Sequence, residues 1–136
     1  MKRIISFIIF LALVVSCSLA CASEPQTRAS DLIVDRYIYA YAYAGGDVKF
    51  TADMTTHGSV DKLGFPSIKL QEKQGSDWVT VKSASNKYAY NSAFHSYSIS
   101  FSGTSGNEYR VVVEYYAKDG SVSDTKTKTS SVLIAK

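Results

Sequence analysis

The chain has few of the residues that cross-link or interrupt a fold, since its 136 residues include two cysteines, two prolines and eight glycines. Both cysteines, Cys17 and Cys21, fall in the apolar N-terminal segment, so a domain formed by the remainder has no disulfide and no thiolate metal ligand. It also has no cysteine nucleophile. A domain without disulfides depends on burial and hydrogen bonding alone.

The N-terminal segment has the three parts of a secretory signal peptide, predicted here for residues 1–22. Lys2 and Arg3 precede an apolar run that extends to Val15. A small-residue cleavage motif follows, and it consists of Ala20, Cys21 and Ala22, with cleavage expected before Ser23.

A second interpretation of the same segment is a lipoprotein signal. The stretch Val14-Val15-Ser16-Cys17 resembles a bacterial lipobox, in which Cys17 would carry the lipid and begin the mature chain. A third is an uncleaved membrane anchor, because the uncharged stretch is close to the length that spans a bilayer. All three predict a folded part outside the cytoplasm, either secreted or held at the cell surface.

Charge is nearly balanced once the signal segment is set aside. The full chain carries 15 basic and 12 acidic residues, a net charge of +3, and loss of Lys2 and Arg3 lowers this to +1. A balanced domain lacks the electrostatic footprint of nucleic-acid or anionic-membrane binding. We therefore expect no nucleic-acid partner and no membrane insertion after signal removal.

Alternation of side chains with a period of two dominates after a polar lead-in at residues 23–32. Two alternating runs flank Gly45-Gly46, and two more flank Gly75-Ser76-Asp77, each pair predicting a β-hairpin. No segment sustains a helical period. Residues 33–136 therefore predict one all-β domain, an antiparallel Greek-key β-sandwich of about seven strands.

Two stretches interrupt the alternation and are expected to be loops. The stretch 56–67 contains the breakers Gly58, Gly64 and Pro66. A polar stretch surrounds Asn86 and Asn91.

A short segment before the last long strands resembles immunoglobulin and fibronectin-type sandwiches. In Gly106-Asn107-Glu108-Tyr109-Arg110-Val111, the tyrosine stands where such folds have a tyrosine corner, whose hydroxyl bonds to upstream backbone. The resemblance implies that role for Tyr109. The alternative is that Tyr109 is simply a core aromatic residue.

Most of residues 23–134 also resembles small secreted β-sandwich proteins of Gram-positive Firmicutes. The resemblance is carried by Glu24-Pro25-Gln26-Thr27-Arg28-Ala29-Ser30-Asp31, by Ile68-Lys69-Leu70-Gln71-Glu72-Lys73 with Trp78, and by Ser102-Gly103-Thr104-Ser105-Gly106 before Tyr109. It implies a secreted β-sandwich and no particular activity.

Four tyrosines at alternate positions form the most unusual local pattern, and they are Tyr37, Tyr39, Tyr41 and Tyr43. A period of two places all four rings on one face of a strand. Exposed, they would form an aromatic platform for sugar rings or peptide. Packed inward, they would form part of the core, and the alanine-rich opposite face favours this second interpretation.

The same uncharged segment could template pairing with another copy if it formed a sheet edge. Alternatively it is paired within the fold, with Arg36 and Asp47 as flanking gatekeepers.

Catalytic and metal motifs are not specified. The only histidines are His57 and His95, and neither belongs to a metal-binding or serine-hydrolase motif. We expect no metal site, no cofactor and no catalytic residues. The sequence favours a non-enzymatic binding or adhesion module for an extracellular protein or glycan. The alternatives are a secreted enzyme or inhibitor that uses a histidine site, and a self-associating or antagonistic secreted factor.

Overall fold

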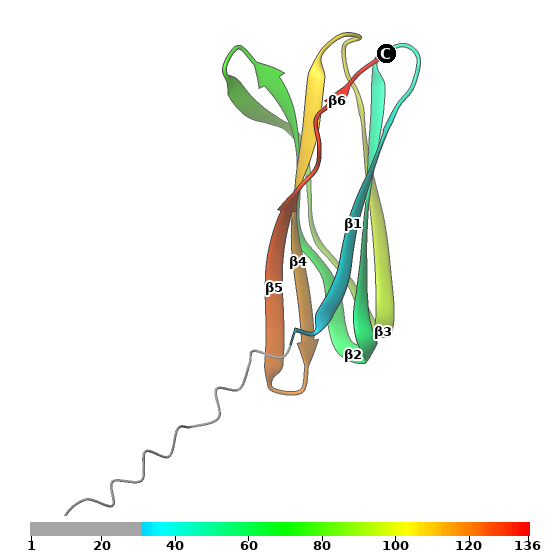
Figure 1. The fold of residues 1–136 in the computed structure, drawn as a ribbon, viewed down its shortest axis with the longest axis vertical. Coiled ribbons are helices and arrows are strands. Elements are labelled where there is room, and N and C mark those ends of the chain that lie inside the picture. The colour runs from blue at the N-terminus through cyan, green and yellow to red at the C-terminus, as the bar shows by residue number, and fades with distance from the viewer. Residues whose placement is uncertain (1–30) are drawn as a thin grey trace, which may run out of the picture.

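The computed structural model describes residues 31–136, and every element in this part of the chain is a β-strand (Figure 1). The predicted signal peptide, the Ala20–Ala22 cleavage motif, Cys17 and most of the lead-in lie outside the described residues. Every strand pair is antiparallel. The prediction of an all-β antiparallel domain is therefore confirmed.

Six strands form one hydrogen-bonded sheet. They are β1 (Ile33–Ala42), β2 (Asp47–Gln74), β3 (Asp77–Ser102), β4 (Glu108–Asp119), β5 (Val122–Thr129) and β6 (Leu133–Ile134). The main path through the sheet is β1-β2-β4-β5, with β3 paired to β2 and β6 paired to β4. The structure contains both hairpins expected from the sequence, β1–β2 and β2–β3.

The two longest strands, β2 and β3, give the sheet its curl. The first part of β2 lies between β1 and the end of β3, whereas its second part lies between the beginning of β3 and β4. The sheet curls into a half-barrel, and the β2–β3 hairpin runs through both of its parts (Figure 1). The arrangement differs from the seven-strand Greek-key sandwich expected from the sequence, because segments predicted as separate strands are continuous.

The predicted loop at 56–67 is the reason for this difference, because it belongs to β2. The pairing of β2 with β3 is irregular between Thr55 and Val60, and its pairing with β4 is irregular between Gly64 and Ser67. Pro66 falls in the second irregular stretch, where a missing N–H costs no ladder bond. The breakers therefore bend a strand instead of ending it.

The polar stretch around Asn86 and Asn91 is likewise part of β3 rather than a loop. Both asparagines have a positive φ, of 54° and 49°. Asparagine tolerates the left-handed region better than most residues, so it accommodates local distortion of the strand. Such distortions let β3 follow the bend of β2.

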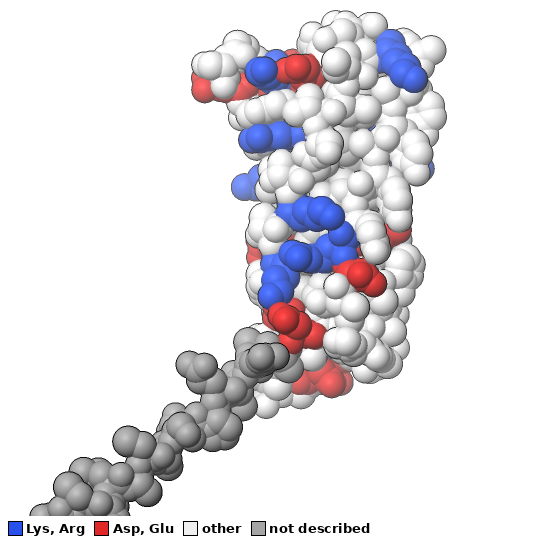
Figure 2. Space-filling view, in the orientation of Figure 1, with Lys and Arg blue, Asp and Glu red and all other residues white. Residues whose placement is uncertain are grey.

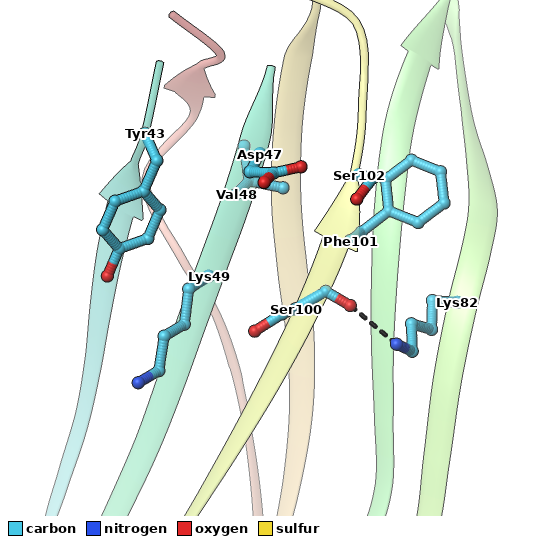
Figure 3. A pocket seen from close by; sticks show the side chains of 8 residues that line it. All are labelled: Tyr43, Asp47, Val48, Lys49, Lys82, Ser100, Phe101 and Ser102. Atoms are coloured by element: carbon cyan, nitrogen blue, oxygen red, sulfur yellow. Dashed lines mark hydrogen bonds between the residues drawn. The ribbon is translucent and has the colours of Figure 1, made fainter. Parts of the chain in front are cut away.

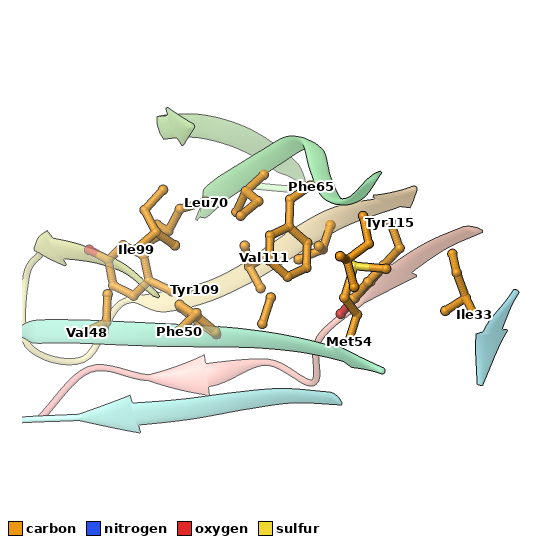
Figure 4. Close-up of a cluster of buried hydrophobic side chains, with 14 of the residues drawn as sticks. Ile33, Val48, Phe50, Met54, Phe65, Leu70, Ile99, Tyr109, Val111 and Tyr115 are labelled. Atoms are coloured by element: carbon orange, nitrogen blue, oxygen red, sulfur yellow. The ribbon is translucent and has the colours of Figure 1, made fainter. Parts of the chain in front are cut away.

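The core lies inside the curl, between β2 and β4 (Figure 4). Its largest fully buried side chains are Tyr109, Tyr115, Phe50, Phe65, Met54, Leu63, Ile68 and Leu70. Tyr115 packs edge-on against Phe65, with ring centroids 5.4 Å apart. A buried side chain of this size contributes about 1.5–3 kcal/mol by leaving water.

In the part of the sheet formed by β1, the first part of β2 and the end of β3, a lysine bonds to the backbone of each outer strand. Lys128 of β5 donates a hydrogen bond to the carbonyl of Arg36 at 2.7 Å, across the gap between β5 and β1. Lys82 donates to the carbonyl of Ser100 on β3, also at 2.7 Å. Lysine is a common guard of exposed sheet edges because its charge disfavours pairing with another chain.

Gly64 provides a test of the bend. It has a φ of 152°, and a Cβ there would lie 2.1 Å from the carbonyl oxygen of Lys87 and 2.7 Å from the Cα of Tyr88. Since backbone atoms cannot move aside cheaply, we expect Gly64→Ala to lower the free energy of unfolding by about 2–4 kcal/mol. Urea denaturation measures the loss.

Gly58→Ala is the matched control, because a Cβ at Gly58 would meet no atom within 4 Å. This variant should stay within about 0.5 kcal/mol of the original chain. Equal stability of the two variants would contradict the role given to Gly64.

Candidate functional site

The four alternate tyrosines lie on the outside of the half-barrel. Their exposed fractions are 50% for Tyr37, 44% for Tyr39, 47% for Tyr41 and 50% for Tyr43. On the opposite side of β1, Ile38 packs against the core. The rings therefore form an exposed aromatic column along the strand.

Residues of β2 and β3 extend this column into a three-strand surface. Residues paired on neighbouring strands point to the same side of a sheet, so the registers define four rows. The rows are Tyr37–Asp53–Ser96, Tyr39–Thr51–Ser98, Tyr41–Lys49–Ser100 and Tyr43–Asp47–Ser102. We call these twelve residues the tyrosine face.

Side-chain hydrogen bonds hold the polar part of the tyrosine face. The hydroxyls of Thr51 and Ser98 are 2.8 Å apart, and the hydroxyl of Ser96 donates to the carboxylate of Asp53. The rings of Tyr37 and Tyr39 are stacked, with centroids 6.3 Å apart. The surface thus has its hydroxyl and aromatic groups arranged before any ligand arrives.

A hollow of about 420 Å³ lies at the end of the tyrosine face near the β1–β2 turn (Figure 3). Its lining consists of Tyr43, Asp47, Val48, Lys49, Lys82, Ser100, Phe101 and Ser102. Lys82 comes from the first part of β3, whereas the serines come from its last part. The curl of β3 therefore brings together groups that are about twenty positions apart in the chain.

Charge is unevenly spread over the molecule. In the view of Figure 2, charged side chains gather along the side that contains β5 and β4 and at the tip of the β2–β3 hairpin, and fewer lie on the opposite side. Within the tyrosine face the charged residues are Asp47, Lys49 and Asp53. Contacts on this surface would therefore come mainly from aromatic rings and hydroxyl groups.

Tyr109 lies in the core rather than on the tyrosine face. Its hydroxyl accepts a hydrogen bond from the backbone N–H of Thr104, five residues upstream, at 3.0 Å and donates to the carboxylate of Glu72 at 2.6 Å. Burial, followed by the hydrogen bond to Glu72, raises the pKa of Tyr109. A Cβ at Gly103 would lie 2.4 Å from this hydroxyl, so the glycine leaves room for the ring.

The two histidines do not form a catalytic site with a carboxylate. His57 is exposed in the irregular part of β2, and His95 is half-buried in β3, stacked on Phe65 with centroids 5.3 Å apart. Among residues 31–136, neither histidine forms a hydrogen bond or ion pair with Asp or Glu, and the buried Nε2 of His95 has no hydrogen-bond partner. Burial lowers the pKa of His95, against the opposing effect of a hydrogen bond with the Lys87 backbone.

No cluster of three or more His, Cys, Asp or Glu side chains suited to a metal ion occurs in residues 31–136. Over the same residues there is no helix with the length and apolar character needed to cross a membrane. Comparison with protein-family models and with curated proteins gives no match to this chain.

Several residues of the site were not singled out by sequence reasoning. Lys49 and the other polar residues of β2 lie beside the tyrosines because of the register, whereas Lys82 reaches the hollow through the curl of β3. The alternation of serines from Ser96 to Ser102 was the one local signal of the residues that β3 contributes to the tyrosine face. Pairing β1 with β2 across their predicted hairpin would also have predicted the residues that β2 contributes to this face.

His95 predicts a pH dependence of stability. Its lowered pKa in the folded chain means that the unfolded chain binds more protons below the ordinary value of 6.5. The free energy of unfolding should therefore fall as the pH decreases from 7 through 6.5 towards the folded-state pKa. His95→Phe keeps an aromatic ring on Phe65 and should make this part of the profile flatter.

Thermal unfolding followed by circular dichroism at pH 5, 6 and 7 measures the effect. His57→Phe serves as the control, since His57 is exposed. A steep fall that persists unchanged in His95→Phe would show that another group is responsible.

Proposed function

We propose that this chain is an exported, non-enzymatic binding module that holds an extracellular glycan on the tyrosine face. The observation that carries the proposal is the column of four tyrosines, each about half exposed, on one strand. Large exposed apolar surface of this kind marks contact sites in soluble proteins. Tyrosine suits such a site because its ring is rigid and its hydroxyl can bond to the ligand or to water.

The spacing of the rings suits a linear polymer. Alternate residues of a strand are about 6.6–6.8 Å apart, so the rings repeat regularly along β1. The apolar faces of sugar rings can stack on them, while their hydroxyls meet the hydroxyl and carboxylate groups of β2 and β3. One strand therefore offers several equivalent contacts, each weak, to successive units of one chain.

The arrangement of acids supports binding without hydrolysis. A glycosidase places two carboxyl groups about 5–9.5 Å apart across the scissile bond. Asp47 and Asp53, the two acids of the tyrosine face, are six residues apart on one strand, which corresponds to about 20 Å. The histidines lie away from this surface and lack a carboxylate partner among residues 31–136.

Export and the finer fold assignment are parts of the same proposal. Export rests on the signal-like segment at residues 1–22, with lipid attachment at Cys17 as the alternative. The hydrogen bond from the Thr104 N–H to the Tyr109 hydroxyl supports a relation to immunoglobulin-like sandwiches, in which a corner tyrosine bonds to upstream backbone. A Gram-positive source would fit a disulfide-free secreted domain.

Retention on polysaccharide tests the proposed function. The double variant Tyr39→Ala with Tyr41→Ala removes the two central rings, and stacking on each ring contributes about 0.5–1.5 kcal/mol. We expect retention to be weaker by about fivefold or more on bacterial cell walls that have been treated with protease. The pull-down is quantified over a series of cell-wall concentrations.

Tyr90→Ala is the control, because Tyr90 is 63% exposed in β3 but does not belong to the tyrosine face. It should bind as the original chain does. Circular dichroism must show that both variants are folded. Retention that is unchanged in a folded double variant would remove the proposal, and retention lost on protease treatment of the walls would indicate a protein ligand.

A further inference from the structure

We infer that the hollow at the end of the tyrosine face binds an anionic sugar unit, so that the glycan held by this protein is acidic. This inference rests on the proposed function and adds the chemical class of the ligand. Its basis is that two lysines from different strands, Lys49 and Lys82, line one hollow that is continuous with the tyrosine column.

Lys82 is held in place for such a contact. Its ammonium group donates to the carbonyl of Ser100 at 2.7 Å, which fixes the position of the charge. An ammonium group has three N–H donors, so two remain for a ligand. The carbonyl neutralises none of the charge, and among residues 31–136 Lys82 forms no ion pair.

Lys49 provides the second charge. It lies between Tyr41 and Ser100 in the third row of the tyrosine face, and its side chain is only partly buried (Figure 3). It also forms no salt bridge within the described part of the chain. Figure 3 shows the ammonium groups of Lys49 and Lys82 on opposite sides of Ser100, so an anion in the hollow would gain a charge-assisted contact with one of them without breaking an existing ion pair.

The remaining lining fits a sugar rather than a bare ion. The hydroxyls of Ser100 and Ser102 and the carboxylate of Asp47 can bond to ring hydroxyls, and Tyr43 supplies an aromatic wall. Asp47 reduces the formal charge of the hollow to +1, which weakens attraction for highly charged polyanions. A volume of about 420 Å³ falls in the usual range for small-ligand sites, about 300–1,000 Å³.

Register links the hollow to the polymer. Tyr41 pairs with Lys49, and Tyr43 lines the hollow itself, so a chain stacked along β1 would continue directly into it. The anionic group can be a carboxylate, as in a uronic acid, or a phosphate on a sugar. Lysine binds both as a point charge, so the shared chemistry is a single anionic substituent on a sugar ring.

Calorimetric titration of the full chain with defined oligosaccharides tests the inference. The probes are a galactose oligomer with one terminal galacturonic acid unit, the neutral galactose oligomer of equal length, and a galactose oligomer that carries one phosphate. We expect the original chain to bind at least one acidic probe about tenfold more tightly than the neutral one, with the preference reduced in 0.5 M salt. Lys49→Gln and Lys82→Gln should each reduce the preference for the acidic probe, and the two substitutions together should remove most of it.

Lys118→Gln is the matched control, since Lys118 is exposed on β4 and does not line the hollow. It should retain the full preference. Equal binding of acidic and neutral probes, or a preference unaffected by both lysine variants, overturns the inference while leaving the proposed function intact. Loss of all binding in the double variant Tyr39→Ala with Tyr41→Ala, together with a lysine-dependent preference in the original chain, supports both. Failure of the original chain to bind any glycan removes the proposed function itself.

Discussion

The continuous pairing of β2 with β3 is the constraint on which the rest of the structure depends. The hairpin extends from the turn at Gly75 to the pair of Asp47 and Ser102, so it runs through both halves of the sheet. Residues 31–136 contain no cysteine, so the long β2–β3 ladder and the core hold the two halves of the sheet together without a disulfide. β1 and the end of β3 flank the first part of β2, while β4 pairs with its second part, and the core fills the space between the two halves.

Local irregularities decide which side chains enter that core. The buried residues of β2 are first even-numbered, from Val48 to Thr56 and again at Val60, then odd-numbered at Leu63 and Phe65, and finally even-numbered at Ile68 and Leu70. The residues that point inward therefore switch from even to odd numbers and back, because each bulge adds a residue to one strand. A sequence pattern with one fixed period cannot continue across such changes. This is why the regular hairpins could be predicted, whereas the bent stretch at 56–67 was expected to be a loop.

The tyrosine face shows a similar division between local and long-range information. Alternation alone predicted that four rings share one side of a strand, because that follows from strand geometry. Which side faces the solvent depends on where the rest of the sheet lies, and the thin alanine row suggested the wrong answer. The position of Lys82 beside Ser100 depends on the curl of β3, which joins residues eighteen positions apart. No local pattern contains that contact.

The composition of β1 explains how its tyrosines can be exposed without being needed for folding. It offers Ile33 and Ile38 to the core, and its alanines add little, so its burial of apolar surface is modest. The strand is held instead by its ladder with β2 and by the hydrogen bond from Lys128 to the Arg36 carbonyl. Because these bonds involve the backbone, they are indifferent to the outward side chains. The tyrosines can therefore change with little effect on stability, which is a condition that the proposed binding surface has to meet.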